Sequence, residues 1–241
     1  MRNFSFAAMP PVTKHLIIVN AIVWLAAFIS PEIRGAFERY GALYYFTSSQ
    51  FNPVQLLTYM FLHFDFWHLF FNMFALFMFG MTLERVLGQS RFLFYYVACG
   101  LGAALIQEGV FAVMVNHYAS VLPDSMVVAA EHGQYYLGEP VSFKLASLIN
   151  TPVIGASGAV YGILLAFAII FPNLPLYIMF IPVPVKAKWV VIGYAVIELL
   201  QAVSNNPGDN VAHVAHLGGM LVGLVMILYW KKKGTIYGNF Y

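Results

Sequence analysis

Residues 155–171 read GASGAVYGILLAFAIIF, an apolar run that opens on Gly155-Ala156-Ser157-Gly158. The run predicts a helix inside a membrane. A serine at its head is a functional candidate, because polar side chains inside a bilayer are costly. A second apolar run, residues 211–230, carries His216 near its start. A serine and a histidine together form a nucleophile and its base, so whether they meet decides the function.

The composition favours lipid as the surroundings of this chain. Of its 241 residues, 61% are hydrophobic and 9% are charged, whereas a soluble domain carries about 25% charged residues. The net charge of +2 is too small to indicate a nucleic-acid partner. Cys99 is the only cysteine, so an internal disulfide is impossible.

The apolar runs predict one all-α membrane domain over residues 1–241, built as a bundle of six transmembrane helices. Each run is near the length of about 20 residues that crosses a bilayer. The expected spans are 12–29, 66–83, 92–115, 154–171, 189–203 and 211–230.

The basic residues predict that both chain ends lie inside. With the N-terminus inside, only three basic residues fall outside, Arg34, Arg39 and Lys144. The other nine fall inside: Arg2, Lys14, Arg85, Arg91, Lys186, Lys188 and Lys231 to Lys233. This asymmetry agrees with the positive-inside rule.

Helix geometry and small residues favour a meeting of Ser157 and His216. His216 lies about 8 Å below the outer boundary at 1.5 Å per residue, and Ser157 lies at a comparable depth. Small residues at intervals of four let membrane helices approach closely, and they occur in both spans: Gly158, Gly162, Ala166, Ala215, Gly219 and Gly223. The alternative is ordinary helix packing, with the Ser157 hydroxyl bonded to its own backbone.

The chemistry of the pair predicts a catalytic dyad. His216 would take the proton of Ser157 and return it to the leaving amine. Spans 154–171 and 211–230 contain no acid, and Glu198 and Glu108 are expected to be distant. Tyr161 lies one helical turn after Ser157 and either stacks on the imidazole or belongs to the core.

Acyl transfer also needs donors for the developing oxyanion. The backbone N–H of Ser157 is one candidate, and His68 and Asn72, one turn apart in span 66–83, are two more. A competing metal site would use His63, His68, His213 and His216. It is disfavoured because no carboxylate joins at ligand spacing, so no metal is expected.

This combination resembles the rhomboid intramembrane serine proteases of bacterial type. The matching motifs are Gly155-Ala156-Ser157-Gly158 with Tyr161, Ala215-His216-Leu217-Gly218-Gly219, His68-x-x-x-Asn72, and Glu84-Arg85 with Gly88. The resemblance implies that Ser157 is the nucleophile, that His216 is the base, and that His68, Asn72 and the Ser157 amide form the oxyanion hole. It implies a structural role for Glu84 and no cofactor. The expected partners are transmembrane protein substrates and membrane lipid.

The connections differ in how well they fit this resemblance. The first loop, 30–65, lacks a Trp-Arg pair and is aromatic enough to lie in the membrane interface, and the loop 116–148 is long. The stretch 204–210 either covers the dyad as a lid or is a plain turn. Short loops and the absence of a recognisable targeting segment indicate a bacterial inner membrane. A non-catalytic client-binding relative and a small transporter are the alternative functions.

Overall fold

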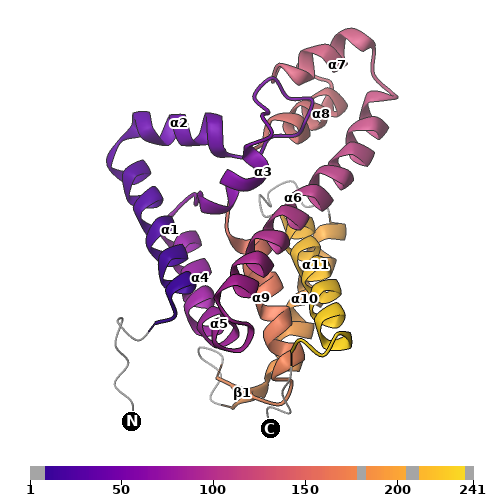
Figure 1. Cartoon of the computed structure of the whole chain (residues 1–241). Helices are drawn as coiled ribbons and strands as arrows, with labels where there is room; N and C mark the ends of the chain where they lie inside the picture. Colours follow the sequence, from indigo (N-terminus) through magenta and orange to yellow (C-terminus); the bar gives the residue numbers. More distant parts are fainter. Residues whose placement is uncertain (1–8, 178–182, 205–211, 237–241) are drawn as a thin grey trace.

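The computed structural model describes residues 9–177, 183–204 and 212–236, and this part of the chain is built mainly of helices (Figure 1). Five helical stretches are long and apolar enough to cross a membrane. They are α1 (Pro11–Ile29), the continuous stretch Phe66–Leu87, α6 (Gln89–Ala119), α10 (Ala187–Ser204) and α11 (His213–Lys232). The sixth membrane helix, α9 (Ser157–Ile170), is apolar but shorter. The protein is therefore an all-α, multi-pass membrane protein, as the sequence predicts.

The boundaries of the membrane helices agree with the predicted spans to within four residues. The second span continues past residue 83 to Leu87 as α4 (Phe66–Ala75), a π-helical turn η3 (Leu76–Gly80) and α5 (Met81–Leu87). The fourth begins at Ser157 rather than at residue 154. Before it, the backbone is extended, and Val153 forms a β-bridge with Leu43.

Helix α9 lies in the interior of the bundle, between α4–α5 and the pair α10–α11 (Figure 1). Glycines let α11 approach it closely, since a Cβ at Gly219 would collide with the carbonyl group of Gly158. A Cβ at Gly162 would meet the Gly219 carbonyl oxygen at 3.1 Å. The small residues of α9 and α11 therefore face each other at these positions. The two helices are packed by close approach of their backbones, as is common in membranes.

Both predicted outer loops contain helices. The first holds α2 (Pro31–Gly41), α3 (Gln55–Thr58) and the 3₁₀ turn η2 (Tyr59–Phe61). The second holds α7 (Asp124–Glu131) and α8 (Pro140–Asn150), which stand with the end of α6 beyond the bundle (Figure 1). At the opposite end of the bundle, β1 (Pro175–Leu176) pairs antiparallel with β2 (Val185–Lys186).

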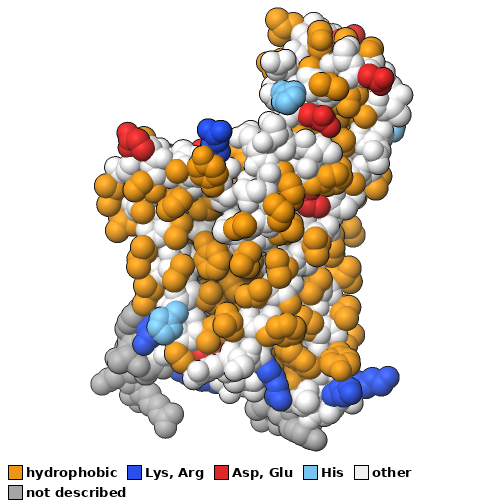
Figure 2. All heavy atoms as spheres, turned by 45° about the horizontal axis from the view of Figure 1, so that its top comes forward, with side chains coloured by type: hydrophobic (Ala, Val, Ile, Leu, Met, Phe, Trp, Pro, Cys, Tyr) orange, Lys and Arg blue, Asp and Glu red, His pale blue; other side chains and the backbone are white. Residues whose placement is uncertain are grey.

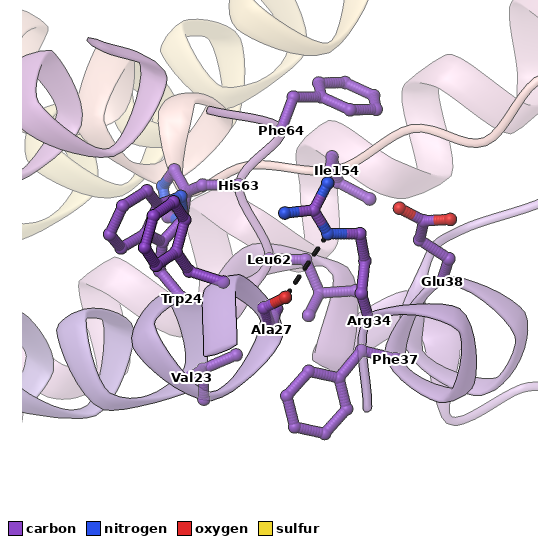
Figure 3. Close-up of a pocket in the computed structure, with 11 residues that line it drawn as sticks. Val23, Trp24, Ala27, Arg34, Phe37, Glu38, Leu62, His63, Phe64 and Ile154 are labelled. Carbon is purple, nitrogen blue, oxygen red and sulfur yellow. Dashed lines mark hydrogen bonds between the residues drawn. The ribbon is translucent and has the colours of Figure 1, made fainter. Parts of the chain in front are cut away.

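Helix α2 is held against α1 around a small pocket of about 30 Å³ (Figure 3). The Arg34 side chain reaches across it, and its Nε–H donates to the Ala27 carbonyl at 3.3 Å. Trp24 of α1 and His63 lie on the other side of the same pocket. The first loop is therefore a packed structure, not only a stretch of interfacial aromatics.

Hydrogen bonds tie one end of the bundle together. Glu84 of α5 accepts the backbone N–H groups of Val12 and Thr13 at 2.9 and 2.7 Å, and the Thr13 hydroxyl at 2.7 Å. Arg91 of α6 donates to the Thr235 carbonyl, which follows α11. The start of α1 and the end of α11 thus lie at the same end, where Lys and Arg side chains gather below a broad apolar flank (Figure 2).

Candidate active site

Ser157 is the first residue of α9, so its backbone N–H has no partner within the helix. Gly155, two residues earlier, has φ +132°, a conformation that side chains with a Cβ rarely adopt. A Cβ there would also lie 2.8 Å from Nε2 of His68. Glycine at 155 therefore turns the chain into α9 and leaves room for His68 beside the serine.

The structure places Ser157 and His216 within hydrogen-bond distance. His216 lies in the first turn of α11, and its Nε2 is 2.7 Å from Oγ of Ser157. The Tyr161 ring stacks on the imidazole, with ring centroids 4.3 Å apart and planes 11° from parallel. Of the two alternatives for Tyr161, the structure has the one in which its ring stacks on the imidazole. The backbone approach of α9 and α11 at Gly158 and Gly219 makes the short Ser157–His216 distance attainable.

The expectation that Glu198, in α10, lies far from Ser157 and His216 is wrong. Its Oε2 lies 2.9 Å from Nδ1 of His216, and its Oε1 accepts a hydrogen bond from the Tyr161 hydroxyl. The helices α10 and α11 are neighbours, so a residue near the end of one is level with the first turn of the other. Spacing along single helices does not reveal such a contact between helices.

The Glu198 contact decides which ring nitrogen of His216 carries the proton. An ionised carboxylate only accepts hydrogen bonds, so Nδ1 of His216 donates and Nε2 presents its lone pair to Ser157. The side chains of Glu198 and His216 are 7% and 9% exposed. At this burial, bulk water competes little for the interaction.

His213 is a neighbour of this group that the sequence interpretation used only in a metal alternative. Its Nδ1 lies 2.6 Å from the same Oε2 of Glu198. Among the described residues, Glu198, His213 and His216 form a group with metal-ligand spacing. His63 and His68 pack against each other instead, with ring centroids 4.9 Å apart. The four-histidine site is therefore not assembled.

His68 presents a hydrogen-bond donor beside Gly155, two residues before Ser157. Asp65 caps α4 by accepting the His68 backbone N–H at 2.8 Å, and Nδ1 of His68 accepts the Phe64 backbone N–H at 3.4 Å. The proton of the neutral ring is therefore on Nε2, the atom beside Gly155. Asn72 donates to the His68 carbonyl at 2.9 Å and lines the same cavity as Ser157.

A cavity of about 890 Å³ joins these residues to the membrane-facing side chains. Ser157, His216, His68 and Asn72 line its polar part. Its apolar wall comes from α4 and α10 and includes Trp67, Phe71, Phe74, Val191 and Tyr194. Several wall residues are also exposed on the flank; Trp67 is 62% exposed. The predicted lid, 204–210, lies outside the described residues except for Ser204.

The comparison with protein families decides the family. Residues 50–233, more than half of the chain, match the family model described as "Rhomboid domain". This chain belongs to the rhomboid family. The rhomboid match spans Ser157, His216, His68, Asn72 and Glu198.

Three curated relatives are similar to this rhomboid protein. Rhomboid protein 1, mitochondrial, of Saccharomyces cerevisiae is 27% identical over 75% of this chain and 43% of its own length. RHOMBOID-like protein 12, mitochondrial, of Arabidopsis thaliana is 31% identical over 70% of this chain and 44% of its own. Presenilin-associated rhomboid-like protein, mitochondrial, of Homo sapiens is 26% identical over 78% and 43%. The chain thus spans less than half the length of these relatives.

Proposed function

We propose that this rhomboid protein is an intramembrane serine endopeptidase that cuts transmembrane segments of other membrane proteins. The observation that carries the proposal is the 2.7 Å contact between Oγ of Ser157 and Nε2 of His216. A serine becomes a useful nucleophile when a base within hydrogen-bond distance can take its proton. Membership of the rhomboid family supports the same activity.

In the proposed reaction, Nε2 of His216 takes the Ser157 proton as Oγ bonds to the scissile carbonyl carbon. The negative charge that develops on the carbonyl oxygen is stabilised by the Ser157 N–H, Nε2–H of His68 and the Asn72 amide. The C–N bond then breaks, and His216 returns the proton to the amine. Water, deprotonated by His216, hydrolyses the acyl-enzyme.

Glu198 acts here as a positioning residue. Its carboxylate holds the proton of His216 on Nδ1 and stabilises the imidazolium that forms when the ring takes the second proton. The Tyr161 hydroxyl fixes the other carboxylate oxygen and its ring covers the imidazole. The group is therefore proposed to work as Ser157, His216 and Glu198 rather than as an isolated dyad.

The short α9 sets the depth of the proposed cut. Its 14 residues span about 21 Å at 1.5 Å per residue, about 9 Å less than a hydrocarbon core of ~30 Å. Ser157 therefore lies below one membrane face, at the end away from the gathered Lys and Arg residues, which is the outer face in the N-in orientation. A substrate helix must unwind there to expose a carbonyl, and Gly or Pro near that level would ease the unwinding.

The apolar cavity supports membrane-embedded helices as substrates. Its aromatic wall between α4 and α10 is exposed on the flank of the bundle, so a partner arriving through lipid keeps its apolar side chains covered. The same cavity favours the second candidate, a non-catalytic rhomboid relative that binds client helices. Such a protein would bind its clients equally well after loss of Ser157 or His216.

The membrane in which the protein works stays a prediction. The three relatives carry the word mitochondrial in their names, so the predicted bacterial inner membrane gains no support from them.

The test is cleavage of a transmembrane substrate by the purified protein in liposomes. Wild-type protein is expected to cut it, and Ser157→Ala and His216→Ala are each expected to abolish the product. Ser147→Ala is the matched control, because Ser147 lies on α8 and donates to the Phe143 carbonyl, away from the site. Client binding that survives in every variant, with no product from wild type, would favour the non-catalytic alternative.

A further inference from the structure

Three metal-ligating atoms meet beside the proposed active site. Glu198, His213 and His216 each offer one ligand atom, and these atoms lie within 4.8 Å of one another. Nδ1 of each histidine is the atom in contact with Oε2 of Glu198. The proposed peptidase uses only the contact between Glu198 and His216. The contact of His213 with the same Oε2, at 2.6 Å, is left without a role by that reaction.

We infer that Glu198, His213 and His216 form an inhibitory binding site for Zn²⁺. Two imidazoles and one carboxylate are ligands that zinc prefers, and three protein ligands plus water complete a tetrahedral site. Ligand atoms of such a site lie about 3.3 Å apart, given bonds of about 2.0–2.2 Å. The O–N separations of 2.6 and 2.9 Å must therefore lengthen by about 0.7 and 0.4 Å.

The arrangement of the side chains fits an ion that enters from the solvent end of α11. His213, at the first position of α11, has a side chain that is 13% exposed, against 7% for Glu198. The two histidine rings are nearly perpendicular, at 87°, and both turn Nδ1 toward the carboxylate. The Tyr161 hydroxyl already holds Oε1, which leaves Oε2 directed at the two rings.

Zinc at this position would switch off the base, and this consequence rests on the proposed peptidase function. The ion takes the lone pair of each Nδ1, so the proton of each neutral ring moves from Nδ1 to Nε2, with no net proton released. Nε2 of His216 then donates to Ser157 instead of accepting its proton. Activity would return when a chelator removes the ion.

The experiment measures zinc binding and inhibition separately, with protein freed of any polyhistidine tag and with buffered free Zn²⁺. Direct binding is measured in Ser157→Ala, which is proposed to be inactive but keeps all three ligands. One zinc per chain is expected, and the same protein carrying His213→Ala should bind at least about tenfold more weakly. This arm gives its result even if the chain cleaves nothing.

Inhibition is measured with otherwise wild-type protein. Zn²⁺ is expected to stop cleavage and EDTA to restore it, whereas Mg²⁺, which prefers oxygen ligands, should have no effect. His213→Ala should need at least about tenfold more zinc for half-inhibition, measured relative to its own rate without zinc. His213→Asn, which keeps a hydrogen-bond donor, is the second variant, and His132→Ala, at an exposed position after α7, is the matched control.

Two results would overturn the zinc site. One is that the Ser157→Ala protein binds no zinc, or binds it equally well with and without His213. The other is an active enzyme whose sensitivity to zinc is the same in wild type and in the His213→Ala and His213→Asn variants. If the Ser157→Ala protein binds zinc and this binding depends on His213, but wild-type protein cleaves nothing, the proposed peptidase function fails and the metal site stands.

Discussion

At the residue scale, the protein surrounds one serine with groups that fix a single proton arrangement. Glu198 holds the proton of His216 on Nδ1, and the Phe64 N–H holds that of His68 on Nε2. His216 therefore presents an acceptor to Ser157, and His68 presents a donor beside Gly155. The two imidazoles have opposite proposed roles because their other ring nitrogens have opposite partners.

Glu198→Gln tests the positioning role. A glutamine can turn either its oxygen or its N–H to Nδ1, and the N–H would place the histidine proton on Nε2, the wrong side for a base. We expect kcat to fall by about 10² or more with KM little changed, and the pH profile of kcat to change. Steady-state cleavage between pH 5 and pH 9 measures both.

Glu108→Gln is the matched control for Glu198→Gln. Glu108 is also a buried membrane carboxylate, but it accepts the Phe46 backbone N–H at 3.1 Å and is not a neighbour of His216. Its replacement should lower stability and leave kcat of the folded protein unchanged. Equal kcat losses in the two variants would contradict a specific role for Glu198.

His63 gives a pH-dependent stability. It precedes α4, and burial, followed by the neighbouring His68, lowers the pKa of His63 from 6.5 to about 3. The unfolded chain therefore binds this proton below about pH 6.5 while the folded chain does not, so stability falls as the pH drops from there toward 3, by at most about 1.4 kcal/mol per unit.

The variant His63→Gln should flatten this decline, because glutamine does not titrate. Apparent melting temperatures in detergent at pH 7.5, 6, 5 and 4 compare it with wild type. A decline of the same steepness in both proteins would mean that His63 is not the titrating group.

At the element scale, the close pairing of α9 and α11 decides whether Ser157 and His216 meet. Each helix brings one of the two residues, and their backbones touch where Gly219 faces the Gly158 carbonyl. Any Cβ at this crossing pushes the helices apart. The Ser157–His216 distance then grows with it, and a shift of 1 Å at a reacting centre costs about 10² in rate.

Gly219→Ala is therefore expected to lower both stability and activity. The overpacking should cost about 1–3 kcal/mol of unfolding free energy. Gly193→Ala on α10 is the control, since a Cβ there meets nothing within 4 Å; it should raise stability by about 0.5–1 kcal/mol. Thermal unfolding and cleavage assays follow both variants, and a Gly219→Ala protein with wild-type rate would argue against the close crossing.

The membrane helices could be predicted from the sequence better than the structure of the loops or the contact of Glu198 with His216. Hydropathy places spans such as 12–29 because length and apolarity are local properties. The helices α2, α7 and α8 fall in stretches that the sequence predicts as loops, since each is short, with 11, 8 and 11 residues. The contact of Glu198 with His216 joins two helices, so no spacing within one helix contains it. A lone acid in span 189–203 was the available signal.

At the scale of the whole molecule, the two ends of the helix bundle differ. Lys and Arg gather at the end that Glu84 and Arg91 tie together, and the α7–α8 segment stands at the other (Figures 1 and 2). The positive-inside rule then predicts that Ser157 opens toward the outer face. The single-domain assignment over residues 1–241 stays a prediction.

Cysteine labelling tests this orientation. Leu137, between α7 and α8, is 91% exposed, and Lys232 ends α11. A membrane-impermeant maleimide added to intact cells should label Leu137→Cys at once and Lys232→Cys only after permeabilisation. The native Cys99 is buried and gives the background. The reverse pattern would invert the topology.

The most direct measurement of the central claim is labelling by a fluorophosphonate probe, which reacts with serines activated by a neighbouring base. The protein in liposomes should be labelled at Ser157, as located by peptide mass spectrometry. Labelling should vanish in Ser157→Ala and in His216→Ala and persist in Ser147→Ala. A folded wild-type protein that takes up no probe, or takes it up equally without His216, would contradict the claim that Ser157 is an activated nucleophile.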